Sequence, residues 1–346
     1  MQNKREMYMQ RCFDLAKLGK MATSPNPNVG AVLVLNGEII GEGYHKKYGS
    51  AHAEVNAIAA VAESQRTEIS NSELFVSLEP CNFVGNTPAC TSLIIHEKIK
   101  KVSLSVIDET NGVNHTGIDK LRSNNIKVET GILKRAGSQI ARQRNTFVSK
   151  RRPYIILKWA ESADGFMGQH DKQVWLTNDY SKRLVHKWRA ETDAIMVGTN
   201  TVVVDDPNLT TRLFPGPSPL RVVIDKKLSI CRKAKIYNNE ADTWIFASIK
   251  RDKLNNISYH KIDNDSDYIS SILSKLYEAN KSSLLIEGGR RLLNSFIAAG
   301  YWDEIRCFKT KDYLRNGVRA PLLYIRPHKS YQLKEDTLKI YFNTQN

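Results

Sequence analysis

Three side chains that can bind a metal and one that can carry a proton occur in the early part of the sequence. His52 and Glu54 are separated by one residue, and Cys81 and Cys90 follow later in the chain. One histidine and two cysteines can supply three ligands of a tetrahedral zinc ion and leave the fourth position for water. A glutamate that is not a ligand can move protons between that water and a bound molecule. The pattern therefore predicts a zinc site with Glu54 as its catalytic proton carrier.

The spacing of the two cysteines differs from the usual signature of this chemistry. Zinc deaminases carry H-x-E followed by P-C-x-x-C, whereas residues 82–89 separate Cys81 from Cys90. Taken singly, His52 would more often cap a helix, and each cysteine would more often be an ordinary buried residue. Together they favour a zinc site, because a strand leads into Pro80-Cys81 and a helix carries His52.

The surrounding segments alternate between strand and helix patterns. Apolar spacing predicts helices at 5–20, 52–63, after Cys90 and at 118–124, and strands at 29–35, 38–45, 74–78, 102–107 and 126–129, with a hairpin turn at 36–37. The expected fold of this half is a sheet covered by helices on both faces. The zinc ligands then lie at or near helix N-termini, where the helix dipole favours thiolates.

Length and composition limit the class of protein. A chain of 346 residues suits two domains, and 41% apolar with 25% charged residues is typical of a soluble globular protein. No apolar run approaches a membrane span, and residues 1–13 contain no secretory signal, so we expect a cytoplasmic protein without a membrane partner. Five cysteines form an odd, sparse set that does not suggest a disulfide framework.

The net charge of +15 raises the question of a nucleic-acid partner. The basic residues are scattered and form neither a tail nor a stripe interleaved with aromatic residues. A small phosphorylated ligand therefore fits better than nucleic acid. A zinc deaminase acting on a nucleic-acid base stays an alternative, which would need aromatic and basic residues along a strand-binding channel.

A basic segment closed by Pro153 divides the chain. Residues 142–153 show little apolar periodicity, and we interpret them as a boundary region with a solvated linker. The predicted division is a first domain at 1–148, a basic linker at 149–153 and a second domain at 154–346. In the second domain we expect strands at 154–159, 194–197, 220–225, 243–247, 284–286, 304–308 and 338–342, and helices at 181–189, 268–277 and 290–299.

One segment of the second domain could bind phosphate. Glu287-Gly288-Gly289 joins a predicted strand to a predicted helix, and its glycines would let backbone N–H groups approach a pyrophosphate. Alone, such glycines are usually just a turn. No G-x-G-x-x-G motif follows the first strand of this domain, so the dinucleotide fingerprint of Rossmann folds is absent.

Several motifs resemble the riboflavin-biosynthesis bifunctional deaminase/reductase family. In the first half they are SPNPNVGAV at 24–32, GYH at 43–45, HAE at 52–54, EPC at 79–81 and TPAC at 87–90, and the family has the long cysteine spacing found here. In the second half they are Lys158, SADG at 162–165, WLT at 175–177, Arg189 and residues 201–212. The resemblance extends from about Tyr8 to Pro321.

The resemblance implies a fold and two successive reactions. The fold is a cytidine-deaminase-like α/β/α layered domain followed by a dihydrofolate-reductase-like α/β domain. The first reaction is zinc-dependent hydrolytic deamination of 2,5-diamino-6-ribosylamino-4(3H)-pyrimidinone 5′-phosphate. The second is NADPH-dependent reduction of the ribosyl chain to a ribityl chain. Zn²⁺, one per chain, and NADPH are thus the expected cofactors, and a homo-oligomer is expected.

The resemblance also implies roles for individual residues. It makes His52, Cys81 and Cys90 the metal ligands and Glu54 the catalytic proton shuttle. Deaminase-substrate contacts fall on Asn26 and His45. Cofactor contacts fall on Ala160, Trp175, Thr201, Asp205, Gly288, Gly289, Arg290, Arg291, Leu292, Leu293, Asn294 and Ser295. Reductase-substrate contacts fall on Lys158, Gln173, Arg189, Leu209, Arg212 and Glu287.

The chain departs from the family pattern near the zinc site. Between the cysteines the family usually has Ser-His-x-Gly-Lys/Arg-Thr-Pro-Pro, whereas residues 82–89 read Asn-Phe-Val-Gly-Asn-Thr-Pro-Ala, and a second change spans 109–116. The missing histidine and basic residue face the substrate in the family. Lys46, Lys47 and His115 are candidates to replace them. A reductase with a degenerate, non-catalytic deaminase domain is therefore a second alternative.

Overall fold

The structure is a computed structural model that describes residues 3–85, 87–110, 114–170, 173–263 and 267–344. It divides into two compact units, Met1–Arg152 and Pro153–Asn346. Asn86 and Asn111, which belong to the two departures from the family pattern, lie outside the described residues. Within those ranges, every helix is too short or too polar to cross a lipid bilayer.

The first unit is built on a five-stranded sheet with the order β2-β1-β3-β4-β5. β1 is antiparallel to β2 and β3, whereas β3, β4 and β5 run parallel. Asn36 and Gly37 both have positive φ, as the predicted hairpin turn between β1 and β2 requires. The elements are α1 (Lys4–Leu18), β1 (Gly30–Leu35), β2 (Glu38–Tyr44), α2 (Ala53–Ala59), η1 (Glu63–Asn71), β3 (Glu73–Leu78), α3 (Cys90–His96), β4 (Lys101–Val106), α4 (Thr116–Ser123), β5 (Lys127–Thr130) and α5 (Lys134–Lys150).

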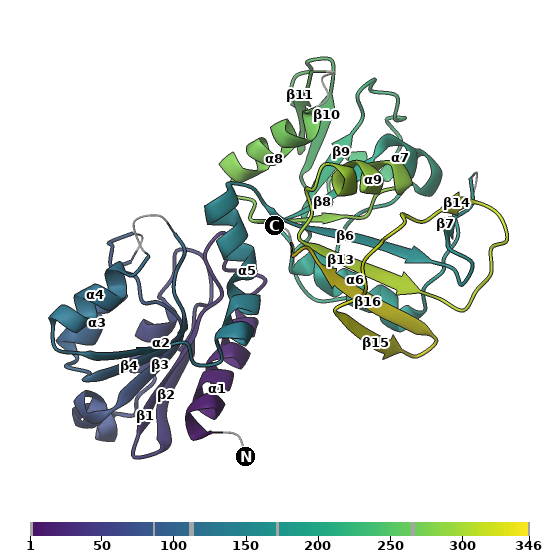
Figure 1. Ribbon diagram of the computed structural model, residues 1–346. Coiled ribbons are helices and arrows are strands. Elements are labelled where there is room, and N and C mark those ends of the chain that lie inside the picture. The colour runs from purple at the N-terminus through teal and green to yellow at the C-terminus, as the bar shows by residue number, and fades with distance from the viewer. Residues whose placement is uncertain (1–2, 86, 111–113, 171–172, 264–266, 345–346) are drawn as a thin grey trace. The chain divides into compact units, whose positions relative to one another are not determined.

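Helices cover both faces of this sheet, as predicted (Figure 1). On one face α1 packs its buried Cys12 and Phe13 against Val32 and Phe75, and the start of α5 joins the same cluster. On the other face α2, α3 and α4 share a core with the opposite side of β1, β3 and β4. Alternate residues of each strand thus enter separate cores, which fixes the register of the sheet.

Two predictions for this unit were wrong. The helix expected at 52–63 ends at Ala59, and a 3₁₀ helix follows at Glu63–Asn71. Apolar spacing continues past the true end and so could not locate it. Residues 142–150, interpreted as a boundary region, instead form the second half of α5. Gly137 and Ala141, the residues of α5 nearest to β3 and β4, are small and weaken the apolar periodicity of a helix that also packs Ile140 and Phe147.

The second unit contains a nine-stranded sheet with the order β11-β10-β9-β8-β12-β6-β13-β16-β15. The strands from β11 to β13 run parallel, and β16 and β15 add an antiparallel edge. The strands are β6 (Tyr154–Glu161), β7 (Phe166–Gly168), β8 (Ala194–Gly198), β9 (Leu220–Ile224), β10 (Thr243–Ala247), β11 (Ile257–Lys261), β12 (Ser283–Ile286), β13 (Glu304–Lys309), β14 (Val318–Arg319), β15 (Lys329–Leu333) and β16 (Asp336–Phe342). The helices are α6 (Asp179–Ala190), α7 (Thr199–Asp205), η2 (Lys235–Tyr237), α8 (Tyr268–Glu278) and α9 (Arg290–Ala298).

Two cores lie on opposite faces of the nine-stranded sheet. α8 and α9 pack on one face, and α6 and α7 pack on the other. All strands and helices predicted for this unit are present, and the additional ones are α7, η2, β7, β11, β14 and β15. In parallel sheets of this kind, ligands bind at the carboxyl ends of the strands.

Candidate active sites

The three predicted zinc ligands lie together at one end of the first unit. His52 is the N-cap of α2, Cys81 follows β3, and Cys90 is the first residue of α3. The Nδ1 atom of His52 is 3.5 Å from the Sγ atom of Cys81 and 3.3 Å from that of Cys90. Zinc bond lengths at a tetrahedral angle separate nitrogen and sulfur ligands by about 3.5 Å. The three groups therefore fit a zinc ion.

The same geometry fixes the charges of these groups. The backbone N–H of Cys90 donates to the Sγ atom of Cys81 at 3.3 Å. Hydrogen bonds from the Cys90 thiol and from His52 lower the pKa of Cys81, which favours the thiolate form of this sulfur. Glu54 is only 3% exposed, and burial, followed by the charge of Cys81, raises its pKa to about 7. A carboxyl group with that pKa can both take and give a proton near neutral pH.

His45 and Asn26, the predicted substrate contacts, lie beside the zinc ligands. His45 Nδ1 donates to the carbonyl of Ala51 at 3.0 Å, which leaves Nε2 to accept from Asn26 Nδ2 at 3.1 Å. Burial lowers the pKa of His45, so its ring is neutral at pH 7. Its centroid is 5.2 Å from that of His52 in an edge-on arrangement. The ring is therefore fixed in position and in tautomer.

These side chains line one cavity of about 320 Å³, a size suited to a small-molecule ligand. Loops that follow different elements complete its wall. The lining residues include Asn26, His45, Tyr48, Ser50, His52, Glu54, Leu78, Glu79, Cys81, Phe83, Thr87, Asp108 and Arg144.

Glu79 holds the loop that follows β4 against the zinc site. Its side chain is 3% exposed and accepts hydrogen bonds from four backbone N–H groups. One carboxylate oxygen accepts from Gly117 and Ile118 at 3.0 and 3.2 Å, and the other accepts from Asp108 and His115 at 3.3 and 3.2 Å. A Cβ on Gly117 would lie 2.1 Å from the carbonyl oxygen of Pro80, so only glycine fits there. Glu79 belongs to the EPC motif at 79–81, but the sequence did not indicate that its carboxylate holds the loop after β4.

The basic residues suggested as replacements do not line the cavity. Lys46, Lys47 and His115 are exposed and are absent from its wall. Arg144 lines it instead, from a part of α5 that the sequence analysis treated as the boundary region. In the sequence Arg144 was only one of several basic residues in 142–153, so nothing marked it as part of a site.

In the second unit, three predicted substrate residues meet at the carboxyl ends of neighbouring strands. Glu287 follows β12, Lys158 lies in the adjacent β6, and Arg189 lies near the end of α6. Arg189 donates from Nε and Nη2 to the two carboxylate oxygens of Glu287, both at 3.0 Å. The Nζ atom of Lys158 is 3.7 Å from the same carboxylate. All three side chains are largely buried.

Opposite charges in this cluster counteract the effect of burial on the pKa of Glu287. Burial alone would raise the pKa of Glu287, but Arg189 and Lys158 hold it at about 2. Burial lowers the pKa of Lys158, and Glu287 opposes that shift. His186, which the sequence analysis did not single out, is 6% exposed and accepts from the backbone N–H of Arg212 at 3.0 Å. Burial, together with Arg189 and Arg212, lowers its pKa to about 4, so it is neutral.

The predicted cofactor positions surround the start of α9. Gly289 is the N-cap of α9, and no side chain caps the N-terminus of this helix. The backbone N–H of Gly289 donates to Thr201 Oγ1 at 3.0 Å. A helix N-terminus next to a strand end suits a pyrophosphate, so the residues present fit a dinucleotide. Leu292 and Leu293 are buried in the core and hold the helix in place rather than exposing side chains to a ligand.

The other residues predicted to contact the cofactor or the reductase substrate are more widely spread over the second unit. Trp175 is 66% exposed, and the ammonium of Lys182 lies 5.3 Å from its ring centroid. Gln173 donates from Nε2 to the backbone carbonyl of Asp205 at 3.3 Å. Ala160 lies in β6, and Leu209 is buried. Arg212 donates to Thr210 Oγ1. The last four predicted positions lie on α9 and are Arg290, Arg291, Asn294 and Ser295.

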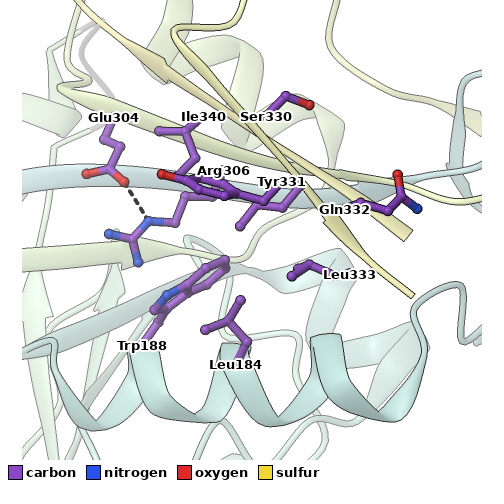
Figure 2. Close-up of a pocket in the computed structure, with 10 residues that line it drawn as sticks. Leu184, Trp188, Glu304, Arg306, Ser330, Tyr331, Gln332, Leu333 and Ile340 are labelled. Atoms are coloured by element: carbon purple, nitrogen blue, oxygen red, sulfur yellow. Dashed lines mark hydrogen bonds and ion pairs between the residues drawn. The ribbon is translucent and has the colours of Figure 1, made fainter. Parts of the chain in front are cut away.

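A separate pocket of about 540 Å³ lies between α6 and the β15–β16 edge and contains none of the predicted site residues (Figure 2). The guanidinium of Arg306 lies over Trp188 there, 4.5 Å from a ring centroid, and donates from Nε to Glu304 at 2.7 Å.

Comparison with known proteins decides the family. Residues 2–106 match the model of the cytidine and deoxycytidylate deaminase zinc-binding region, and residues 153–310 match that of the RibD C-terminal domain. The riboflavin biosynthesis protein RibD of Aquifex aeolicus is 36% identical over 325 residues, covering 92% of this chain and 90% of that protein. The chain belongs to the RibD family.

Solved structures of this family have the same fold. The diaminohydroxyphosphoribosylaminopyrimidine deaminase/5-amino-6-(5-phosphoribosylamino)uracil reductase of Thermotoga maritima superposes with a TM-score of 0.89 at 31% identity, covering 97% of this chain and 98% of that one. Acinetobacter baumannii RibD superposes with a TM-score of 0.88 at 28% identity, and 99% of each chain is covered.

Family membership confirms the fold class and the enzyme class. The chain is a bifunctional deaminase and reductase of riboflavin biosynthesis, with a zinc-dependent hydrolase half and an oxidoreductase half. The predicted cofactors, zinc and NADPH, agree with this family, and the His/Cys/Cys group fits zinc. Membership supports two working halves over both alternatives, the nucleic-acid deaminase and the reductase with a non-catalytic first domain.

Proposed function

We propose that this chain deaminates the phosphorylated ribosylaminopyrimidine named for its Thermotoga relative and then reduces the ribosyl chain of the product. The observation that carries the proposal is the grouping of His52, Cys81 and Cys90 at a cavity lined by His52, Cys81 and the buried Glu54. The second unit adds a cation-rich cluster beside a glycine-capped helix, which suits a sugar phosphate and a dinucleotide.

In the deaminase site each residue has a distinct role. His52, Cys81 and Cys90 would hold zinc, which when bound supplies the Lewis acidity that makes water reactive near neutral pH. Glu54 takes one proton from the attacking water and delivers it to the ring nitrogen. It then takes the second proton from the newly added hydroxyl and delivers it to the amine, which leaves as ammonia when the C–N bond breaks. Asn26 and His45 orient the pyrimidine, because their polar atoms are already fixed by hydrogen bonds to each other and to Ala51.

In the reductase site the protein mainly orients the reacting sugar. Lys158 and Arg189 would bind and position the ribosyl phosphate, with Glu287 holding both cations in place. The N-terminus of α9 and Thr201 would bind the cofactor. The hydride is supplied by the cofactor, so the residues of this chain contribute position and charge.

The finer predictions about partners and location also belong to the proposal. We expect a homo-oligomer in the cytoplasm that has no nucleic-acid partner. Light scattering of the purified protein would test the first expectation, and titration with a fluorescent oligonucleotide would test the last. The scattered positive charge supports small phosphorylated ligands over nucleic acid.

Replacement of the proton carrier tests the deaminase assignment. Glu54→Gln should abolish ammonia release from the diaminopyrimidinone phosphate while zinc content stays near one per chain, because Glu54 is not a ligand. Glu38→Gln, an exposed change in β2, is the matched control and should leave ammonia release intact. Undiminished ammonia release by Glu54→Gln would refute the assignment.

A further inference from the structure

Arg144 reaches the deaminase cavity because α5 packs unusually close to the sheet. A Cβ on Gly137 would lie 2.1 Å from Ser105 Oγ in β4, so glycine permits direct contact between helix and strand. One turn later the buried Ala141 packs against Leu78 and Val106, the last residues of β3 and β4. Arg144 follows on the same helix face and therefore projects over the carboxyl ends of these strands. Leu78 and Arg144 both line the cavity.

The guanidinium of Arg144 joins two loops of the cavity wall. Its Nη1 atom donates to the carbonyl of Pro25 at 3.3 Å, and its Nη2 atom donates to Thr110 Oγ1 at 3.2 Å. The first loop carries Asn26, and the second carries Asp108, whose Oδ1 atom accepts from Thr110. The guanidinium is thus held beside residues that face the cavity, which reduces the entropy lost when it binds a ligand.

The charges along the cavity wall make this position important. Among the described residues that line it, Arg144 is the only arginine or lysine, whereas Glu54, Glu79 and Asp108 bring carboxyl groups. The undescribed positions 86 and 111–113 contain neither lysine nor arginine in the sequence. A ligand with a terminal phosphate therefore meets one permanent side-chain cation on this wall. An arginine fork matches phosphate oxygens better than a lysine does.

We propose that Arg144 binds the 5′-phosphate of the deaminase substrate and takes the place of the basic residue that residues 82–89 lack. The proposal rests on the proposed function, since it assigns the phosphate contact of that same site. It also explains how a deaminase half without the usual histidine and lysine or arginine between its cysteines can still select a phosphorylated substrate.

The test compares the substrate with the same compound lacking its 5′-phosphate. Ammonia release is measured for the wild-type chain, Arg144→Gln, Arg144→Lys and Arg135→Gln, an exposed change on the same helix that removes the same charge. Arg144→Gln should lower kcat/KM for the phosphorylated substrate by about tenfold to a hundredfold, as expected for a hydrogen-bonded charge pair. It should leave kcat/KM for the unphosphorylated compound unchanged. Arg144→Lys should show an intermediate loss, and Arg135→Gln none.

Ribose 5-phosphate gives a second readout. As a competitive inhibitor of ammonia release it should bind the wild-type chain and Arg135→Gln equally and should bind Arg144→Gln and Arg144→Lys more weakly. An equal loss for both substrates in the Arg144 variants would show a structural role and overturn the proposal, as would no loss for either. Absence of ammonia release from the wild-type chain would instead refute the proposed function, so the two failures are distinguishable.

Discussion

At the scale of single residues, the reductase site depends on a histidine that burial keeps neutral. His186 has a pKa of about 4 in the folded chain, compared with 6.5 for an ordinary histidine. Protonation therefore favours the unfolded chain. The stability associated with neutral His186 is fully present above pH 6.5 and is lost as the pH falls towards 4.

This shift predicts a pH-dependent difference between the wild-type chain and His186→Gln. Glutamine can accept the Arg212 N–H bond but does not titrate, so the wild-type chain should lose about 1.4 kcal/mol more per pH unit between pH 6.5 and 4. Urea unfolding followed by tryptophan fluorescence measures this in the second unit, because all five tryptophans lie there. If the unfolding free energies of the two proteins fell equally with pH, His186 would not be held neutral in the folded chain.

A second prediction at this scale concerns the sugar-phosphate contact. Arg189→Ala should raise the KM for the deaminated sugar phosphate about tenfold or more, because it removes a charge-assisted fork. NADPH binding, measured by fluorescence titration, should remain because Arg189 does not lie on α9 or α7. Arg183→Ala, an exposed change on the same helix, is the control. An unchanged KM in Arg189→Ala would contradict the assignment.

At the scale of elements, the zinc site depends on how Glu79 caps the start of α4. Both carboxylate oxygens accept backbone N–H groups. In Glu79→Gln the side-chain NH₂ group would replace one of these oxygens, so two backbone N–H groups would lose their acceptor. The loss of unfolding free energy should be about 2 to 3 kcal/mol. Because Cys81 lies two residues away, zinc retention under dialysis against a chelator should also fall.

The exposed Glu109→Gln is the control for this change, since it removes the same charge from the loop that Glu79 holds. Circular dichroism and metal analysis of the two variants separate the effects. Equal zinc retention in Glu79→Gln and the wild-type chain would contradict the account of α4.

The elements also show what the sequence could and could not predict. Apolar patterns located the five strands of the first sheet, seven of the nine strands of the second sheet and most helices, whereas the edge strands β11 and β15 were not predicted. The grouping of His52, Cys81 and Cys90 followed from a motif. No helix was predicted over α5. Its residues nearest to the sheet are glycine and alanine, which weaken the apolar periodicity, and its basic residues suggested a solvated segment. Arg144 was missed for the same reason, since its role depends on where that helix lies.

At the scale of the whole molecule, the chain carries two sites in two separate compact units. The compact units divide between Arg152 and Pro153. The finer division into a first domain at 1–148, a basic linker at 149–153 and a second domain at 154–346 stays a prediction. Each activity should be lost independently, because none of the residues proposed for one site belongs to the other unit. Glu54→Gln should leave NADPH oxidation with the deaminated substrate unchanged, and Arg189→Ala should leave ammonia release unchanged.

The most direct test of the account is a paired assay on the unmodified chain. Ammonia release from the diaminopyrimidinone phosphate and NADPH oxidation with its deaminated product are measured on one zinc-loaded preparation. Two working sites predict both signals, and the first should disappear when zinc is removed. NADPH oxidation without any ammonia release would contradict the account, since it would mean that the first unit is a scaffold for the reductase.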